Sequence, residues 1–568
     1  MIKIEKFKFL GLSLLLVSGA YAQDAEQAKK AIDAEKYQNA KKILKTLIAS
    51  NDDEGKNYFL LGDVYLKQNE QDSAAIYFNK GKGVKKDAEY NSIGLAHIDL
   101  NNGNTSAAQA KFKAVEDELR RKDVEQLVYI GRAYIDSDNP DYKNAIAVLK
   151  RALEKDDKNA QAYLSLGDAY VGNENYNDAY KAYRDAFSLD NTVLRAKLQL
   201  GVITKNTRAA FPEAVKAFED ILALNANYGP AYRELAETYA LWANTDTSKY
   251  DQYIKKALDY YEKYMQLTDY SLNSRMRHAD FLVLARDYKA LEAEAKKMQE
   301  LDKVNPRILR YLSYSAYENG NYEGSLKAMN EFITKVDSKR LIARDYLYLG
   351  LAKLASTVST DEEGNSIITD QVVFDEAIND IKKAAEMDIE ITNEFNAIGK
   401  KLFGQRLYGP ASIVFEVATT NPDNKNAFYD NFYLAYSIYY DHVNKSEEDK
   451  KLNMERLVVA DAALAKVIEL SPEAQDAFLF KARINQYMQS EEAYSEMAKA
   501  YDEYIKIVSA KDAASLTANE LKNLIEAYSN AGAYYAVKDK AKAKEYFNKA
   551  LELDPNDEYI KGELERMK

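Results

Sequence analysis

Three histidines and one short glycine motif are the residues of this chain best suited to chemistry, and their spacing argues against it. His97, His278 and His442 lie far apart in the sequence, too far to predict a shared metal ion. Gly81-Lys82-Gly83 begins like a dinucleotide-binding loop, but Lys86 stands where the third glycine belongs. The chain has no cysteine, so it has no thiolate metal ligand. We therefore predict no catalytic residue, no metal site and no cofactor.

A recurrent helical pattern accounts for most of the sequence. A small residue is followed four positions later by a large apolar residue and three positions after that by another small or apolar one, and this spacing places all three on one helical face. The series is Ala40/Leu44/Leu47, Ala74/Phe78/Gly81, Ala108/Phe112/Val115, Ala145/Leu149/Ala152, Ala179/Tyr183/Ala186, Ala214/Phe218/Ile221, Ala257/Tyr261/Tyr264, Leu291/Ala295/Met298, Ser325/Met329/Phe332, Ala377/Ile381/Ala384, Ala411/Phe415/Ala418, Ala460/Leu464/Val467, Met497/Tyr501/Tyr504 and Ala543/Phe547/Ala550.

A second set of residues precedes the small residue of the triplet at a fixed spacing. Tyr58, Leu61, Gly62 and Tyr65 come before Ala74, and Tyr163, Leu166, Gly167 and Tyr170 come before Ala179. These offsets resemble the tetratricopeptide repeat, a helix–turn–helix unit of about 34 residues. The resemblance covers roughly residues 24–568 and implies an all-α fold. We expect a right-handed superhelical solenoid of about fourteen units with a C-terminal capping helix.

The resemblance also implies where a partner would bind. In this family the first helix of each unit lines a concave groove for extended peptides or partner helices, and members act as scaffolds far more often than as catalysts. Groove positions such as Asp63, Lys67, Gln161 and Asp168 are mixed in charge, so the carboxylate clamp of chaperone-binding members is not predicted.

Tyrosine is unusually abundant, with 45 residues against a single tryptophan. Many, such as Tyr65 and Tyr170, are expected to pack between helices. Others fall on groove positions of the later units, where large rings with a hydrogen-bonding tip suit recognition. A register shifted by one residue would instead place them between helices. The predicted partner-binding residues are Tyr314, Tyr317, Phe432, Tyr436, Tyr439 and Tyr440.

The first 22 residues differ from the rest. Three early lysines precede a short apolar run, and Ala20-Tyr21-Ala22 offers an A-x-A cleavage site. We predict a signal peptide cleaved after Ala22 and a periplasmic mature chain, of the secreted kind found in Bacteroidota. A buried N-terminal helix is the alternative. No later segment is apolar enough to predict a transmembrane span.

The repeat pattern suggests four segments: a signal peptide at 1–22, a regular array at 23–340, a less regular array with loop insertions at 341–555, and a capping helix at 556–568. The period breaks at Trp242–Tyr250, Ser356–Val373, Tyr440–Lys451 and Ser509–Asn519. Such insertions map to loops, either beside the binding face or as tolerated surface excursions.

Charge and composition limit the classes of partner and function that the sequence supports. The net charge of −12 and the absence of a long basic run argue against nucleic acid as a partner. The first prediction is a non-catalytic periplasmic scaffold that binds proteins or peptides of the cell envelope. The alternative is a glycan-binding accessory protein in nutrient uptake, which the lack of a lipid-anchor cysteine and the scarcity of tryptophan disfavour. An enzyme would need a globular domain, for which only residues 473–524 leave room.

Overall fold

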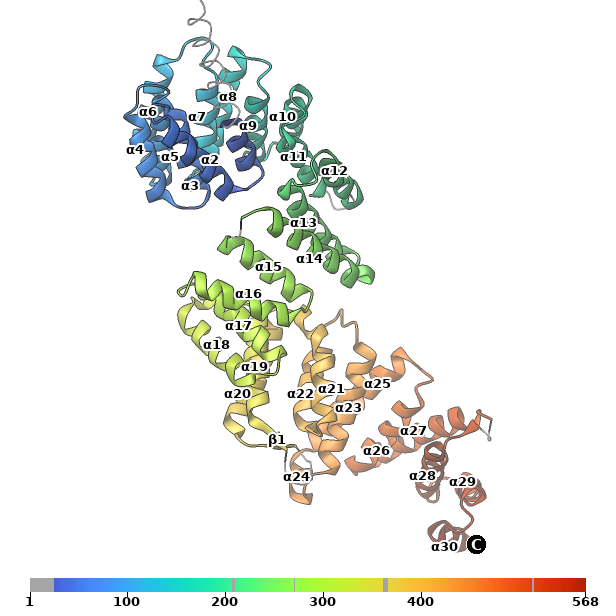
Figure 1. Ribbon diagram of the computed structural model, residues 1–568. Helices are drawn as coiled ribbons and strands as arrows, with labels where there is room; N and C mark the ends of the chain where they lie inside the picture. Colours follow the sequence, from blue (N-terminus) through green and yellow to red (C-terminus); the bar gives the residue numbers. More distant parts are fainter. Residues whose placement is uncertain (1–24, 207–209, 270, 361–365, 513–514) are drawn as a thin grey trace, which may run out of the picture. The chain divides into compact units, whose positions relative to one another are not determined.

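A computed structural model describes residues 25–206, 210–269, 271–360, 366–512 and 515–568. The described chain is built of helices that pack in consecutive antiparallel pairs, as Figure 1 shows. The helices form two compact units, 1–302 and 303–568. The predicted signal peptide lies outside the described residues.

Unit 1 consists of helix pairs in sequence order. The pairs are a helix at 25–33 with α2 (Tyr37–Ser50), α3 (Gly55–Lys67) with α4 (Gln71–Lys82), α5 (Glu89–Asn101) with α6 (Thr105–Glu118), α7 (Glu125–Asp136) with α8 (Tyr142–Lys155), α9 (Ala160–Gly172) with α10 (Tyr176–Leu189), α11 (Leu194–Lys205) with α12 (Phe211–Leu224), α13 (Gly229–Thr245) with α14 (Tyr250–Leu267), and α15 (Leu272–Leu284) with α16 (Tyr288–Leu301).

Unit 2 continues the same arrangement. Its pairs are α17 (Arg307–Glu318) with α18 (Tyr322–Lys335), α19 (Ala343–Thr357) with α20 (Gln371–Met387), α21 (Phe395–Gly404) with α22 (Tyr408–Thr419), α23 (Ala427–Val443) with α25 (Met454–Leu470), α26 (Gln475–Met488) with α27 (Glu491–Ser509), and α28 (Ala518–Tyr535) with α29 (Lys540–Leu553), followed by α30 (Glu558–Arg566). Pro422 and Pro472 each lie between two pairs, and Pro555 lies between the last pair and α30, where proline ends a helix.

The period breaks take several forms. Short 3₁₀ turns, η1 (Thr247–Lys249), η2 (Ser338–Arg340) and η3 (Ile389–Glu394), join helices, and α24 (Glu447–Leu452) fills the break after α23. The break after α19 is not simply a loop. There β1 (Val358–Thr360) pairs antiparallel with β2 (Ser366–Ile368), and Val358 faces Ile368 across the pair. Branched side chains in these short runs favour strand, which the helical period could not reveal.

The small–large–small triplets confirm the helical prediction. Every predicted triplet lies on the second helix of a pair, from α2 to α29, and its three residues are buried there. The pattern therefore located the second helix of each helix pair correctly, because the buried face of a helix must recur at helical spacing.

In several helix pairs the large residue of the triplet fits against a glycine on the first helix of the same pair. The Phe78 ring occupies the space that a Cβ would need at Gly62 and also at Gly94 of the next unit. Phe415 fills the equivalent space at Gly399, and Tyr183 does so at Gly167. The missing side chain thus lets a ring pack directly on the neighbouring backbone.

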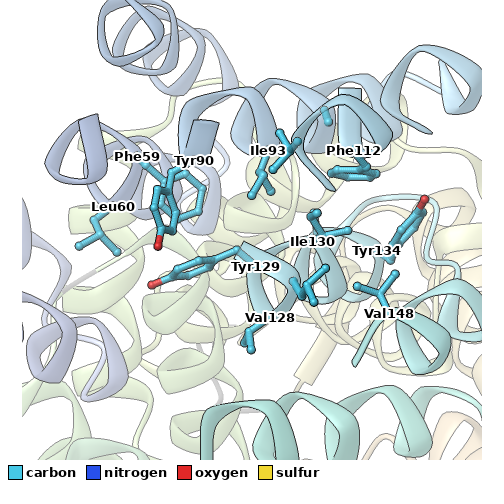
Figure 2. Close-up of a cluster of buried hydrophobic side chains, with 14 of the residues drawn as sticks. Phe59, Leu60, Tyr90, Ile93, Phe112, Val128, Tyr129, Ile130, Tyr134 and Val148 are labelled. Atoms are coloured by element: carbon cyan, nitrogen blue, oxygen red, sulfur yellow. The ribbon is translucent and has the colours of Figure 1, made fainter. Parts of the chain in front are cut away.

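Aromatic rings also join one helix pair to later pairs, as Figure 2 shows for the first half of unit 1. The ring centroids of Phe59 on α3 and Tyr129 on α7 lie 4.6 Å apart, edge to face. Tyr90 on α5 lies 5.8 Å from Tyr129 in a similar geometry. Such pairs add about 0.5–1.5 kcal/mol each beyond the area they bury. The hydrophobic core in this part of unit 1 therefore continues from one helix pair to the next.

Turns between paired helices require a left-handed residue. Gly103 and Gly320 supply it with φ of 76° and 84°, as their Asn-Gly-Asn surroundings predict. Asn69, Glu174 and Arg286 adopt the same conformation at equivalent turns. The turn geometry therefore persists where the sequence carries no glycine.

Two substitutions in α21 test the glycine contact. A Cβ at Gly399 would lie 2.5 Å from Cζ of Phe415, so Gly399→Ala should lower the free energy of unfolding of unit 2 by about 1–3 kcal/mol through overpacking. Gly404, in the same helix, has no atom within 4 Å of the equivalent position, so Gly404→Ala should leave stability unchanged or slightly higher. Urea unfolding followed by circular dichroism measures both, and equal midpoints would contradict the proposed contact.

Candidate functional site

Helix α23 of unit 2 presents a row of aromatic side chains. Tyr429, Phe432, Tyr436 and Tyr439 follow one another at spacings of three and four residues, which places them on one face. The opposite face, with Leu434 among its residues, is buried in the core. Tyr429 is 54% exposed, and the other three rings are half-buried. The helix is thus anchored by one face and offers aromatic surface on the other.

A buried ring from the next helix pair supports this surface. Phe480 of α26 lies 4.0 Å from Tyr436 and 5.2 Å from Tyr439, measured between ring centroids. Phe432 lies 4.2 Å from Tyr436 on the other side. These contacts hold the rings in place before any ligand arrives, which lowers the entropy lost on binding. We name Tyr429, Phe432, Tyr436, Tyr439 and Phe480 the aromatic face.

Charged and polar groups border the aromatic face. The Lys400 ammonium of α21 lies 4.9 Å from the Tyr429 ring centroid, a cation–π distance. Arg483 of α26 lies over Phe480 and donates two hydrogen bonds of 2.7 Å to the Glu526 carboxylate on α28. These groups combine an apolar centre with a polar rim, which is typical of protein-binding surfaces.

The hydroxyl groups of Tyr436 and Tyr439 stay protonated at physiological pH. Burial raises the pKa of Tyr439 to about 12 and also raises the pKa of Tyr436. Each therefore keeps a neutral phenol that can donate or accept a hydrogen bond. The surface can bind apolar groups and hydrogen-bonding groups together, but it presents no nucleophile.

An open hollow adjoins the aromatic face between α23, α26 and α27, with a volume of about 730 Å³. Phe428 and Phe432 line it from α23, and Ile507 and Ala510 from α27 and its end. Lys511 at its edge is held by the Glu520 carboxylate at 2.6 Å. The hollow could therefore receive an apolar side chain from a segment lying on the aromatic face.

Tyr440 lies beside this row rather than in it. Its ring stacks on Tyr408 of α22 at 5.3 Å and contacts Phe403 of α21 at 6.0 Å. Tyr440 is half-buried, so part of its surface is accessible, but its contacts tie α23 to the preceding pair.

The two predicted tyrosines of α17 lie apart from the aromatic face. Tyr314 is only 2% exposed, donates a 2.7 Å hydrogen bond to the Asp345 carboxylate and stacks on Tyr348 at 4.3 Å. Tyr317 is half-buried against Tyr322 and Tyr348. Tyr314 therefore packs between helices, which is the alternative that the sequence left open. Partner binding by the six predicted residues stays a prediction.

Two residues of the aromatic face were not among those predicted. Tyr429 precedes Phe432 by three residues and so shares its helical face, which means that the pattern contained the signal. Phe480 lies on a different helix and is buried, and only its contact with Tyr436 reveals it.

The histidines lie on three separate helices: His97 on α5, His278 on α15 and His442 on α23. Within the described ranges, no group of three or more histidine, aspartate or glutamate side chains could hold a metal ion. None of the helices that the structure describes has the length and apolar character needed to cross a bilayer.

Paired helices with buried triplets define a helical repeat protein. Tetratricopeptide repeat models match residues 25–88, 138–200 and 526–557. The chain therefore contains tetratricopeptide repeats in these ranges. Repeats of this kind imply a protein-binding scaffold, in a family that is generally non-catalytic.

Similar proteins include long eukaryotic chains. The human Superkiller complex protein 3 is 28% identical over 125 residues, 21% of this chain. The Xenopus laevis Tetratricopeptide repeat protein 37 is 28% identical over 122 residues, 22% of this chain. The matched region spans 8% of the length of each of these relatives.

Solved structures with similarity include two bacterial proteins. One is the C-terminal part of a TPR repeat-containing protein from Cytophaga hutchinsonii, with 21% identity and a TM-score of 0.32, covering 51% of this chain and 98% of that one. The other is PilF of Pseudomonas aeruginosa, with 18% identity and a TM-score of 0.31, covering 38% of this chain and 92% of that one.

Substitutions at Tyr314 and Tyr429 should separate core from surface tyrosines. Tyr314→Ala should lower the free energy of unfolding by about 3–5 kcal/mol because it opens a cavity and leaves Asp345 with one donor fewer. Tyr429→Ala should change it by less than about 0.5 kcal/mol because the ring is largely exposed. Urea unfolding measures both; a similar loss for the two variants would contradict this assignment.

Proposed function

We propose that this protein is a non-catalytic scaffold of the periplasm that binds segments of cell-envelope proteins on the aromatic face. The observation that carries the proposal is the row of accessible rings on α23, held by Phe480 and bordered by Lys400 and Arg483. Aromatic and arginine side chains dominate binding energy at protein interfaces. The periplasmic location rests on the predicted signal peptide.

The geometry favours a segment with apolar side chains at regular intervals. A peptide lying along α23 would cover several rings and could place one side chain in the hollow beside Phe432. Burying an apolar side chain contributes about 1.5–3 kcal/mol, so two or three such contacts support binding without any charged clamp. This agrees with the mixed charge of the predicted groove positions.

Site-specific photo-crosslinking in the cell tests the binding surface. A photoreactive phenylalanine analogue at position 429 should give a discrete crosslinked protein, whereas the same analogue at position 559 should not. Tyr559 is a matched control because it is 55% exposed in the same unit, on α30 away from the aromatic face.

The companion variant is Tyr436→Ala combined with Tyr439→Ala. It should abolish the crosslink from position 429 because two rings of the surface are removed. An unchanged crosslink, or the same products from positions 429 and 559, would contradict binding at the aromatic face. Saturable heat on titration with polysaccharide fragments, in place of a protein crosslink, would favour the glycan-binding alternative.

The predicted location has a separate test. Export with cleavage after Ala22 should yield a periplasmic chain that begins at Gln23, measurable as the intact mass of the purified protein. Retention of residues 1–22 in a cytoplasmic fraction would contradict the location and leave binding at the aromatic face to be judged by the crosslinks alone.

A further inference from the structure

Residues 25–38 contact helices of unit 1 that lie far along the chain, and we name this segment the N-terminal latch. The Glu35 carboxylate lies at the centre of these contacts. It accepts a 2.5 Å hydrogen bond from the Arg233 guanidinium of α13 and a 2.7 Å bond from the Tyr264 hydroxyl of α14. The first helix pair thus meets the seventh directly.

The beginning of α2 is capped from the same distant region. The N-cap residue Lys36 provides no side-chain hydrogen bond. Instead the Asp269 carboxylate, in the segment after α14, accepts a 2.5 Å bond from the backbone N–H of Gln38. A carboxylate at a helix N-terminus satisfies an otherwise unpaired donor and interacts favourably with the helix dipole. One end of α2 therefore depends on a residue 231 positions away.

Further charges hold the helix at 25–33. Lys29 lies 3.2 Å from the Glu125 carboxylate of α7, which also pairs with Lys56. Burial opposes ionisation of Glu125, but these two lysines hold its pKa below the ordinary value. Asp33 lies close enough to Arg195 of α11 for the charges to interact, and burial raises the Asp33 pKa. The latch therefore reaches α7, α11 and α13.

The latch has both apolar and polar contacts. Ala28 and Ala31 are buried, and Ile32 and Tyr37 pack partly buried against the core. A helix of this length is only marginally stable on its own. Polar contacts with distant helices therefore add to this apolar packing in keeping the latch in place.

The latch contacts α7, α11 and α13, each the first helix of its pair, and the resemblance to the repeat family implies that first helices line the groove. We name the surface that these helices present to the latch the inner face of unit 1. Charged groups on this inner face also pair among themselves, with Lys67 3.4 Å from Asp136 and Arg195 2.9 Å from Asp168. A partner carboxylate would have to displace Glu35 of the latch to reach Arg233 and Asp168 of α9 to reach Arg195. Carboxylates of the chain itself already occupy these guanidinium groups.

We propose that the inner face of unit 1 is a binding surface for a helical segment that presents carboxylates to its arginines, and that its occupant is the N-terminal latch of the same chain. The chemistry is that of Glu35 pairing with Arg233 and Tyr264, with Asp33 near Arg195. The latch closes unit 1 against other ligands, and its displacement frees Arg233 from Glu35, whereas Arg195 is also paired with Asp168 of α9. The aromatic face of unit 2 has no such occupant among the described residues.

Hydrogen exchange read by mass spectrometry tests the latch in the full-length protein. Glu35→Gln should raise the exchange rate of amides in 25–50 at least tenfold while α8 in the same unit keeps its protection. Glu26→Gln is the matched control, because Glu26 is exposed and pairs only within the latch, with Lys29 at 3.0 Å. The control should exchange like the wild type.

A synthetic peptide with the sequence of residues 25–38 provides the second readout. It should bind the Glu35→Gln and Asp269→Asn variants at least tenfold more tightly than the wild type, because their own latch is more often displaced. Faster exchange throughout unit 1, unchanged exchange in 25–50, or equal peptide affinity for wild type and variants would each overturn the proposal. Crosslinking at position 429 concerns unit 2 and fails or succeeds independently.

Discussion

The contact between a large side chain on the second helix and a glycine on the first is the constraint on which this protein depends. Phe78 packs on both Gly62 and Gly94, so one ring holds its own pair together and joins it to the next pair. Phe415 at Gly399 repeats the arrangement in unit 2. Each helix pair is stabilised mainly by contacts with adjacent pairs, so this contact contributes to the stability of the array from one pair to the next.

The need to satisfy buried hydroxyl groups explains part of the tyrosine content. Tyr183 donates to Asp168 at 2.8 Å, and Tyr501 donates to Glu526 at 3.0 Å. Each of these bonds joins a second helix to a first helix, and that of Tyr501 reaches the next unit. Tyrosine can therefore replace phenylalanine in the core while tying neighbouring helices with a hydrogen bond. Only tyrosines that lack such an interior role, such as Tyr429, contribute to the surface.

The two units use their inner faces differently. In unit 1 Arg233 of α13 pairs with Glu35 of the latch and Arg195 of α11 pairs with Asp168 of α9, so ion pairs dominate the surface. In unit 2 the corresponding helices α23 and α26 carry rings, and Arg483 is held by Glu526. One repeat architecture thus carries a charged surface in unit 1 and an accessible aromatic one in unit 2, because the exposed side chains of the first helices can vary while the buried triplets keep the pairs packed.

The sequence by itself determined the helix pairs, since burial of one face at helical spacing is a local requirement that each triplet meets. It also indicated the row on α23, whose members share one helix. The tertiary structure alone decided that Tyr314 turns inward to Asp345, that Phe480 supports the aromatic face, and that Glu35 reaches Arg233. These contacts depend on small rotations between successive units, which accumulate over many residues and leave no periodic trace in the sequence.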